Sequence, residues 1–143
     1  MNTILYVNDY EFKIISDNYN NGYEISFTED NIKIVIDINP EENRLQLYRF
    51  YNSTGIKGLG KKILTILLNH LHSINKINDD TKLYLYTTDN PNKKLIKYYK
   101  LLGLKCYNNK DNKVVNGRYS RYVYMKCSIR HFLNLNFEDT FLS

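Results

Sequence analysis

The sequence contains few cysteines and no tryptophan. Its 143 residues include two cysteines, Cys106 and Cys127, which stand far apart and lack the paired spacing of a zinc site. We therefore expect two reduced cysteines on strands, without a disulfide or a bound metal. The three histidines, His70, His72 and His131, form no ligand pattern either. Tryptophan is absent, and Asn, Ile, Lys and Tyr are abundant. An A+T-rich genome produces such a bias, which then carries no information about activity.

The sequence also lacks long apolar runs and internal repeats. No basic-then-apolar leader with a small-residue cleavage site is found, and no apolar run approaches the roughly 20 residues that span a bilayer. We expect a soluble, cytoplasmic protein with no membrane partner. A length of 143 residues with 43% hydrophobic residues is enough for one domain and short for two.

The charge balance is basic, with a net charge of +5 and a pI near 9.1. Such a balance permits an anionic partner without naming one. The segment 118–126 interleaves arginines and a lysine with tyrosines, which is a composition that binds single-stranded nucleic acid. The alternative is a late amphipathic strand with tyrosines on both faces. We favour the strand, so nucleic acid is not the expected partner.

The chain is organised around the stretch from Leu45 to Ile74. A β-branched and aromatic run leads into a glycine-bearing turn, and the turn opens into a periodic helix. Apolar residues recur at helical spacing, and a polar set that includes Thr65 falls mostly on the opposite side. The apolar set is Leu59, Ile63, Leu64, Ile66, Leu67, Leu71 and Ile74. This pattern predicts a strand, a loop and a buried helix.

The turn is suited to holding an anion. A helix N-terminus carries unpaired N–H groups and the positive end of the helix dipole, and glycines let a phosphate approach the backbone. The segment 55–62 fits the Walker loop until its last place, where Lys62 replaces the hydroxyl that holds magnesium. The dinucleotide fingerprint fits Gly58 and Gly60 but has Ile63 in place of its third glycine. An ordinary strand-to-helix turn is the remaining alternative.

A third phosphate loop fits better. Gly55-Ile56-Lys57-Gly58-Leu59-Gly60 resembles the acetyl-coenzyme A (acetyl-CoA) loop of the GNAT acetyltransferase superfamily at its two glycines, with Gly55 in place of the usual Gln or Arg. The segment 92–104 resembles the second GNAT signature, since Asn92, Tyr99 and Gly103 keep its spacing. The two motifs stand in the family's order and separation. The chain thus resembles a GNAT N-acetyltransferase.

This resemblance implies an α+β fold, a mixed and mostly antiparallel sheet with two helices on it. Strands at 45–51 and 83–88 are expected to lie parallel, linked by the helix after Gly60, and to splay apart at their ends. Strands are also expected at 10–16, 23–28 and 32–38. No periodic segment supplies the helices that follow the first strand of the family, so we expect these to be missing or reduced.

The resemblance also implies roles for individual residues. The pantetheine arm would pair with the backbone around Phe50, Tyr51 and Asn52, and amides from Gly58 to Lys61 would hold the pyrophosphate. Tyr99 would protonate the departing thiolate, although Leu95, Tyr99 and Leu102 share a helical face and Tyr99 could instead be a core aromatic. The cofactor-binding set is Phe50, Tyr51, Asn52, Gly55, Ile56, Lys57, Gly58, Leu59, Gly60, Lys61, Asn92 and Tyr99.

No general base stands out. The strand position where some family members carry a Glu lies within the segment 43–47, which contains no carboxylate. Nearby acids, Asp37, Glu41, Glu42 and Asp89, are candidates that also suit turns or the surface. A chain of waters would serve as well.

The sequence therefore predicts a single GNAT-like domain, 1–143, with a cofactor-binding core at 45–104 and an apolar tail at 130–143. The tail either covers the open acceptor side, pairs with a second copy, or packs as a terminus. The predicted function is transfer of acetyl from acetyl-CoA to a primary amine, with no metal. The alternatives are a GNAT-like module that binds coenzyme A or protein without catalysis, and a small nucleic-acid-binding domain.

Overall fold

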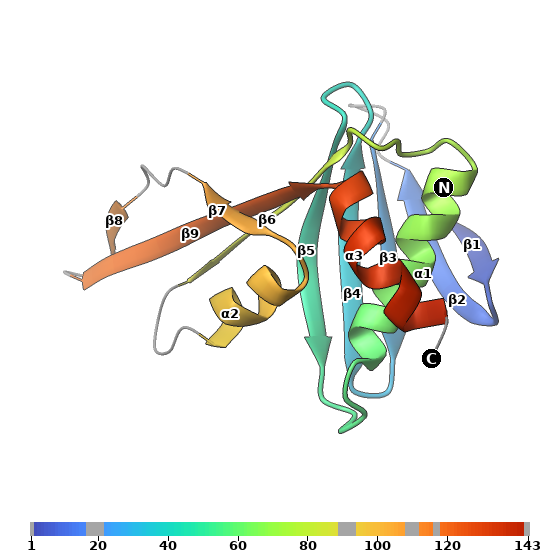
Figure 1. Ribbon diagram of the computed structural model, residues 1–143, viewed down its shortest axis with the longest axis horizontal. Coiled ribbons are helices and arrows are strands. Elements are labelled where there is room, and N and C mark those ends of the chain that lie inside the picture. Colours follow the sequence, from blue (N-terminus) through green and yellow to red (C-terminus); the bar gives the residue numbers. More distant parts are fainter. Residues whose placement is uncertain (1, 17–21, 89–93, 108–111, 116–117, 142–143) are drawn as a thin grey trace.

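The computed structural model describes residues 2–16, 22–88, 94–107, 112–115 and 118–141 (Figure 1). Within these ranges, nine strands and three helices follow one another. The strands are β1 (Asn2–Val7), β2 (Tyr10–Ser16), β3 (Tyr23–Glu29), β4 (Ile32–Asn39), β5 (Arg44–Asn52), β6 (Lys82–Thr88), β7 (Lys105–Tyr107), β8 (Asn112–Val115) and β9 (Arg118–Ser128). The helices are α1 (Leu59–Ser73), α2 (Lys94–Leu101) and α3 (Ile129–Phe141).

The strands form one sheet in the order β1-β2-β3-β4-β5-β6-β9-β7, and β8 pairs with β9. Among the described strands, every pairing is antiparallel except that of β5 with β6, which is parallel. A parallel pair needs a crossover connection, and α1 supplies it between β5 and β6. The expected mixed, mostly antiparallel α+β architecture is confirmed.

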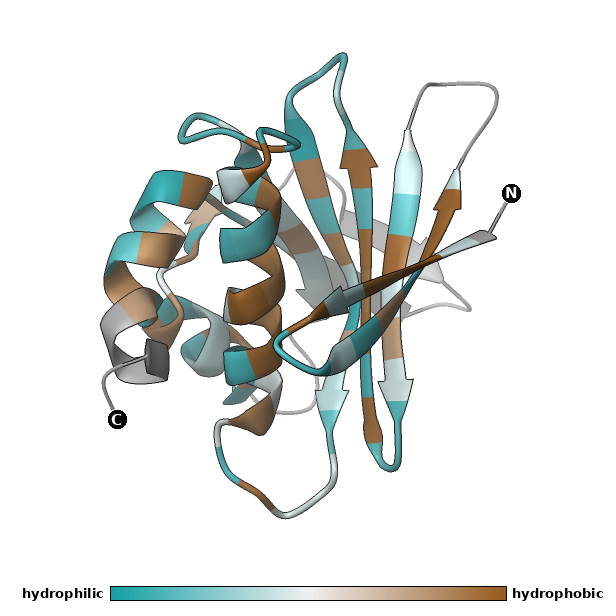
Figure 2. Cartoon of the chain, turned by 90° about the vertical axis from the view of Figure 1, so that its right-hand side faces the viewer, coloured by the Kyte–Doolittle hydropathy of each residue, from teal (hydrophilic) through white to brown (hydrophobic). Residues whose placement is uncertain are grey.

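The core lies between α1 and the strands. Alternate residues of β3 and β4 point inward, such as Ile25, Phe27, Ile34 and Ile36, and meet the apolar face of α1. Helices α1 and α3 lie side by side against the strands (Figure 2). Helix α3 contacts α1. Thr65 of α1 is fully buried, and its Oγ1 donates a hydrogen bond to the Lys61 carbonyl at 2.7 Å. The expectation that Thr65 faces solvent was wrong.

Three elements, β1, β8 and α3, were not predicted. Strand β1 forms a hairpin with β2, and the tail folds into a third helix, α3. Phe132 is fully buried, and Asn136 donates from Nδ2 to the carbonyl oxygens of Leu102 and Phe132 at 2.9 and 2.8 Å. The tail, as far as it is described, therefore packs against its own chain.

The family's early helices are absent from the described structure, as expected. Strand β2 ends at Ser16, which pairs directly with Tyr23 at the start of β3. The helices in the described ranges all come later in the chain, after β5. Among the described residues, no helix therefore covers the sheet face opposite α1 between β2 and β5.

Helix α2 ends in a glycine that cannot be replaced without strain. The Gly103 N–H donates to the Lys100 carbonyl and the Leu104 N–H donates to the Tyr99 carbonyl, with a φ of +108° at Gly103. This is the Schellman arrangement that closes a helix, and only glycine adopts this φ readily. The buried face of α2 is made by Ile96 and Tyr99. Leu95 is 51% exposed, so the expectation that Leu95 shares the core face with Tyr99 was wrong.

Candidate functional site

Strands β5 and β6 meet and then diverge. They pair at three positions, and the last of these joins Gln46 to Tyr84. Beyond this pair, β5 continues with β4 and β6 continues with β9. Figure 1 shows the two strands close together at the top of the view and far apart below, with α2 beside the opening. The expected splay is present, and we call the Gln46–Tyr84 pair its vertex.

A β-bulge follows the vertex directly. Leu47 pairs with Ile36 and Arg49 with Val35, so Tyr48 is an extra residue in β5 without a partner in the register. A bulge bends its strand and increases its twist, which turns β5 away from β6. Beyond the bulge, peptide groups on one side of β5 face the opening and no described strand pairs with them.

The expected pantetheine segment lies on this open edge. Phe50 is half-buried, whereas Tyr51 and Asn52 are exposed. The Asn52 side chain shapes the following turn, since its Nδ2 donates to the Ile56 carbonyl at 2.9 Å and its Oδ1 accepts from the Thr54 N–H at 3.1 Å. The end of β5 and the glycine turn are thus one hydrogen-bonded unit.

The glycine turn leaves backbone donors open at the start of α1. Gly55 and Gly58 both have φ of +81°, and Gly58 is the N-cap residue. No residue in the described ranges accepts a hydrogen bond from the N–H of Gly58 or Gly60. The first turn of α1 contains no acidic residue, and Lys57 and Lys62 are exposed beside it. These features suit an anion.

Gly60 has a packing role as well. A Cβ placed on Gly60 would lie 3.2 Å from Cε1 of Phe50 and 3.5 Å from Cβ of Asn52. Glycine therefore lets α1 begin directly against the end of β5. By contrast, a Cβ on Gly55 or Gly58 would meet no atom within 4 Å, so these two positions need glycine for their backbone conformation alone.

Tyr99 lies across the opening from the glycine turn. Its ring centroid is 6.5 Å from that of Phe50 and 5.5 Å from that of Tyr98, and Tyr99 is 9% exposed. Burial, with a smaller effect from Tyr98, raises the pKa of Tyr99 to about 12. Burial also raises the pKa of Tyr98 above its usual value. Tyr99 is therefore part of the core, and its phenol stays protonated at neutral pH.

The acidic candidates differ in their surroundings. Glu42 forms an ion pair with Arg44 at 3.1 Å, and Glu41 is exposed in the β4–β5 turn. Asp37 lies on β4 beside the vertex, opposite Gln46. Asp89 and Asn92 lie outside the described residues. Of the candidate bases, the described structure brings only Asp37 into the row of residues that meets the vertex.

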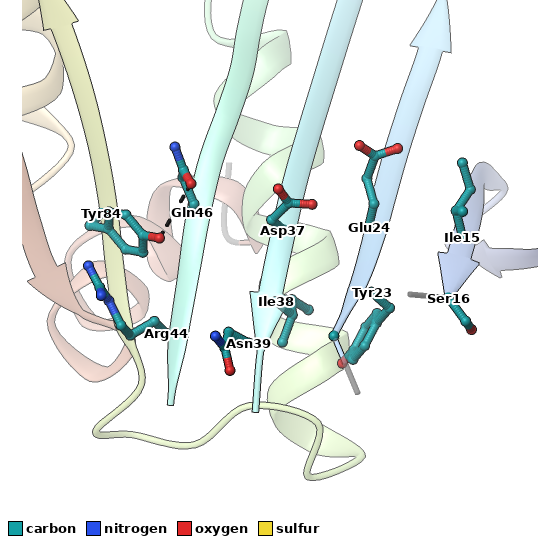
Figure 3. Close-up of a pocket in the computed structure, with 11 residues that line it drawn as sticks. Ile15, Ser16, Tyr23, Glu24, Asp37, Ile38, Asn39, Arg44, Gln46 and Tyr84 are labelled. Atoms are coloured by element: carbon teal, nitrogen blue, oxygen red, sulfur yellow. Dashed lines mark hydrogen bonds between the residues drawn. The ribbon is translucent and has the colours of Figure 1, made fainter. Parts of the chain in front are cut away.

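A cavity of about 330 Å³ adjoins the vertex, and we call it the vertex cavity (Figure 3). It is lined by residues of β2 to β6 together with Gly22, among them Tyr23, Glu24, Asp37, Asn39, Arg44, Gln46 and Tyr84. Tyr84 Oη donates to Gln46 Oε1 at 3.3 Å across the vertex. The sequence analysis did not single out Glu24, Gln46 or Tyr84, because strand register decides that they meet.

Both cysteines lie on strands, as expected, with Cys106 on β7 and Cys127 on β9. Both are free thiols in the structure. Among the residues that the structure describes, no group of three His, Cys, Asp or Glu side chains is arranged to hold a metal ion. None of the described helices has the length and apolar character needed to span a bilayer.

Solved structures resemble this architecture closely. The spermidine/spermine N-acetyltransferase SpeG from Vibrio cholerae, solved with manganese ions, matches with a TM-score of 0.59 and 18% identity, over 82% of this chain and 71% of its own. A single-site variant of the same enzyme gives 0.60 and 18% over 82% and 71%. A GNAT-family protein from Desulfovibrio desulfuricans gives 0.57 and 14% over 76% and 69%.

This chain has the GNAT fold. No protein-family model matches its sequence, and no curated protein matches it either. The GNAT fold therefore emerges from the arrangement of the strands, with the splay, the glycine turn and α2 in their family order. The identities of 14 and 18% leave the substrate to be argued from the residues of this chain.

Proposed function

We propose that this chain is an acetyl-CoA-dependent N-acetyltransferase that moves an acetyl group directly to a primary amine in a ternary complex. The observation that carries the proposal is the opening between β5 and β6, which begins at Gln46–Tyr84 and ends at the glycine turn. The end at the glycine turn offers backbone N–H donors for an anion, and the end at Gln46 and Tyr84 adjoins the polar vertex cavity.

The residues of the glycine turn fit the phosphate part of acetyl-CoA. The N–H groups of Gly58 and Gly60, with the backbone of Leu59 and Lys61, would hold the pyrophosphate. The side chain of Lys57 would add mobile positive charge. Gly55 and Ile56 would shape the surface over which the phosphates approach the turn, since Gly55 has a positive φ and Ile56 is 59% exposed.

The open edge of β5 fits the pantetheine part. The amide groups of pantetheine can pair with the peptide groups of Phe50, Tyr51 and Asn52 in the way that an added strand pairs with a sheet edge. Asn92 is also proposed to bind the cofactor, and this assignment rests only on its spacing in the motif at 92–104. Bound acetyl-CoA would supply a thioester carbonyl to an amine that approaches from the vertex.

The reaction forms a C–N bond and breaks a C–S bond. Starting from the ammonium form, two protons leave the nitrogen, one before the attack and one after it, while one proton is returned to sulfur and the other is released to solvent. An aliphatic amine with a pKa near 10.4 is neutral in only about one molecule in a few thousand at pH 7. A base or a water chain must therefore take a proton from the ammonium group. Asp37 is the acid closest in register to the vertex and is our candidate for this role.

Tyr99 is proposed to assist the leaving thiolate. Because its pKa is about 12, it remains a hydrogen-bond donor throughout the neutral and alkaline range. An ordinary thiol has a pKa of about 8.5, so a full transfer that leaves tyrosinate is unfavourable. We therefore assign Tyr99 a strong hydrogen bond to the developing thiolate, with the proton replaced from solvent.

The acceptor is proposed to be an amine with more than one nitrogen. Solved structures with this fold include enzymes named for spermidine and spermine. A polyamine is therefore the first acceptor to try, followed by amino sugars and peptide amines.

The test is turnover with acetyl-CoA and a panel of amines, followed by mass spectrometry of the amine and by release of free thiol. We expect one acetyl group per product molecule. Tyr99→Phe should lower kcat by about a hundredfold, whereas Tyr98→Phe is the matched control in the neighbouring position and should change it little. If acetyl-CoA binds saturably but no amine in the panel is acetylated, the chain is a binding module and the proposal is wrong.

A further inference from the structure

Strand register gathers tyrosines on one face of the sheet, over β6, β9 and β7. Tyr86 of β6 lies opposite Tyr124 of β9, and Tyr124 lies opposite Tyr107 of β7. Directly opposed residues in neighbouring strands point to the same face. The ring centroids of Tyr86 and Tyr124 are 6.1 Å apart, and those of Tyr107 and Tyr124 are 5.6 Å apart. These aromatic rings therefore form one contiguous row, which we call the tyrosine row.

A second row beside the tyrosines carries positive charge. Two residues along the same strands, Tyr84 lies opposite Lys126, and Lys126 lies opposite Lys105. Because side chains alternate along a strand, this second row points to the same face as the tyrosine row. Both lysines are exposed. The Lys126 Nζ lies 4.6 Å from the centre of the Tyr107 ring, so rings and positive charges are interleaved on this face.

This face points away from the hydrophobic core. Leu85 on β6 and Met125 on β9 stand between the two rows in sequence, and they are 2% and 0% exposed and belong to the core. Tyr86, on the other face, is 48% exposed. Figure 1 shows β6, β9 and β7 extending together beyond α1 and α3. The tyrosine row is therefore accessible to a large ligand.

Positive charge prevails where this face meets β5. A cavity of about 360 Å³ is lined there by Glu42, Asn43, Arg44, Asp80, Lys82, Tyr107 and Lys126. Glu42 is paired with Arg44 at 3.1 Å, and the Arg44 guanidinium also lies 4.2 Å from the centre of the Tyr84 ring. Among these lining residues the cations outnumber the acids, and Lys82 and Lys126 are both exposed. The charge of this face therefore favours an anionic partner.

Rings interleaved with lysines suit single-stranded nucleic acid. Each base offers a flat ring that stacks on an aromatic side chain, and each phosphate offers a charge that a lysine neutralises. A duplex keeps its bases stacked on one another, and an acidic peptide would use the lysines without the rings. From the sequence, nucleic acid was set aside because tyrosines were expected on both faces of the segment 118–126. The described part of β9 places Tyr124 and Lys126 on one face, with rings and a lysine that β6 and β7 supply.

We propose that the face of β6, β9 and β7 binds single-stranded nucleic acid, with bases stacked on the tyrosine row and phosphates beside the lysines. The residues that make this face are Tyr84, Tyr86, Lys105, Tyr107, Tyr124 and Lys126. Tyr84 stands at its border with the opening between β5 and β6. The proposal does not depend on the proposed acetyl transfer, since no residue of the glycine turn takes part.

The test is fluorescence anisotropy of a labelled thymidine oligonucleotide titrated with the full chain. Coenzyme A is added in excess, so that the oligonucleotide does not occupy the glycine turn through its phosphates. We expect saturable binding, which Tyr86→Leu should weaken by about tenfold because a stacking ring is lost. Tyr86→Phe keeps the ring and should bind like the wild type. Tyr6→Leu is the matched control, at a tyrosine that is 68% exposed on β1 at the far edge of the sheet.

Salt dependence tests the lysines and needs no aromatic substitution. The affinity of the wild type should fall as salt is added, because lysines that neutralise phosphates release counterions. Lys105→Gln should reduce the slope of log affinity against log salt concentration by about one. Lys13→Gln, at an exposed position of β2, should leave the slope unchanged.

Four results would overturn the proposal. They are no saturable binding at low salt, equal effects of Tyr86→Leu and Tyr6→Leu, displacement of the oligonucleotide by coenzyme A, and equal binding of polyphosphate, which has no rings. Tighter binding of a polyglutamate peptide than of the oligonucleotide would also contradict it and would indicate an acidic protein partner. Loss of acetyl transfer would appear in separate assays and would leave the oligonucleotide titration unchanged.

Discussion

The ring of Phe50 in β5 lies directly against the backbone of Gly60 in α1, close enough that a Cβ on Gly60 would sit 3.2 Å from Cε1 of Phe50. The same ring stacks at 6.1 Å from Tyr98 of α2. Phe50 thus joins the glycine turn to the helix that carries Tyr99, across the opening between β5 and β6. The turn proposed to bind the phosphates and the helix that carries the proposed hydrogen-bond donor are therefore both in contact with one aromatic side chain.

Replacing Gly60 tests this packing. Gly60→Leu should lower the free energy of unfolding by about 1 to 3 kcal/mol, because the side chain must displace Phe50. Gly60→Ala should change it by less than about 1 kcal/mol, since the gain in helix propensity offsets a smaller contact. Chemical denaturation of the two variants and the wild type measures the difference. Equal stability of the Leu and wild-type chains would contradict the described contact.

The pH dependence of turnover tests the state of Tyr99. A phenol donates only while protonated, and burial raises the pKa of Tyr99 to about 12, so the donor is present below that pH and lost above it. The reacting amine gains its neutral form as pH rises toward about 10.4. We therefore expect kcat to rise with pH and to show no falling limb below about pH 11. A falling limb near pH 9 would show that a different acid assists the thiolate.

The buried amide that ties α3 to α2 gives a stability prediction. Asn136 is 2% exposed and donates to the Leu102 carbonyl, so Asn136→Ala leaves a buried acceptor without this donor. We expect a loss of about 1 to 3 kcal/mol in the free energy of unfolding. Asn134→Ala, at an exposed position of the same helix, is the control and should stay within about 0.5 kcal/mol of wild type. Denaturant titration distinguishes them.

The two thiols should differ in reactivity. Cys106 is exposed, whereas burial raises the pKa of Cys127 to about 12, so its reactive thiolate is scarce near pH 8. Iodoacetamide should therefore label the native chain at Cys106 and leave Cys127 unlabelled, and both should react after denaturation. Peptide mapping by mass spectrometry gives the result. Labelling of both thiols in the native chain would show that β9 is more open than described.

Much of the fold could be predicted from the sequence because its signals are local. The extended run before Asn52, the glycines of the turn and the helical spacing of α1 each act over a few residues, and together they specify a strand–turn–helix unit. The parallel pairing of β5 with β6 then follows from the crossover helix. The expected site segment from Phe50 to Lys61 lies where these local signals place it.

The third helix was missed although a signal was present. No glycine or proline separates β9 from α3, so the residues that most often mark a boundary between elements are missing here. The Ser128 Oγ accepts a hydrogen bond from the His131 N–H at 3.1 Å, which is the usual N-cap contact three residues into a helix. Ser128 followed by a mixed apolar run was therefore a helix start signal that the sequence analysis did not use.

The row of opposed residues Glu24, Asp37, Gln46 and Tyr84 could not be predicted, for a different reason. Each residue belongs to a different strand, and only the register decides that they meet. A shift of one residue in any pairing would turn the corresponding side chain to the other face of the sheet. The acid at Asp37 was a candidate base from its position in the sequence, but its neighbours across the sheet emerge from the structure alone.

The turn before α1 is proposed to hold the phosphates of acetyl-CoA, and the decisive measurement is calorimetric titration of the purified chain with acetyl-CoA. We expect saturable binding of one molecule per chain. Ile56→Glu adds a negative charge beside the turn at an exposed position, Ile56→Gln is its neutral match, and Ile74→Glu adds the same charge just beyond the far end of α1 at a residue that is 45% exposed. Ile56→Glu should weaken binding by about five- to tenfold through charge repulsion, with little change in the other two. No saturable binding to the wild type, or equal affinities for Ile56→Glu and Ile56→Gln, would contradict the account.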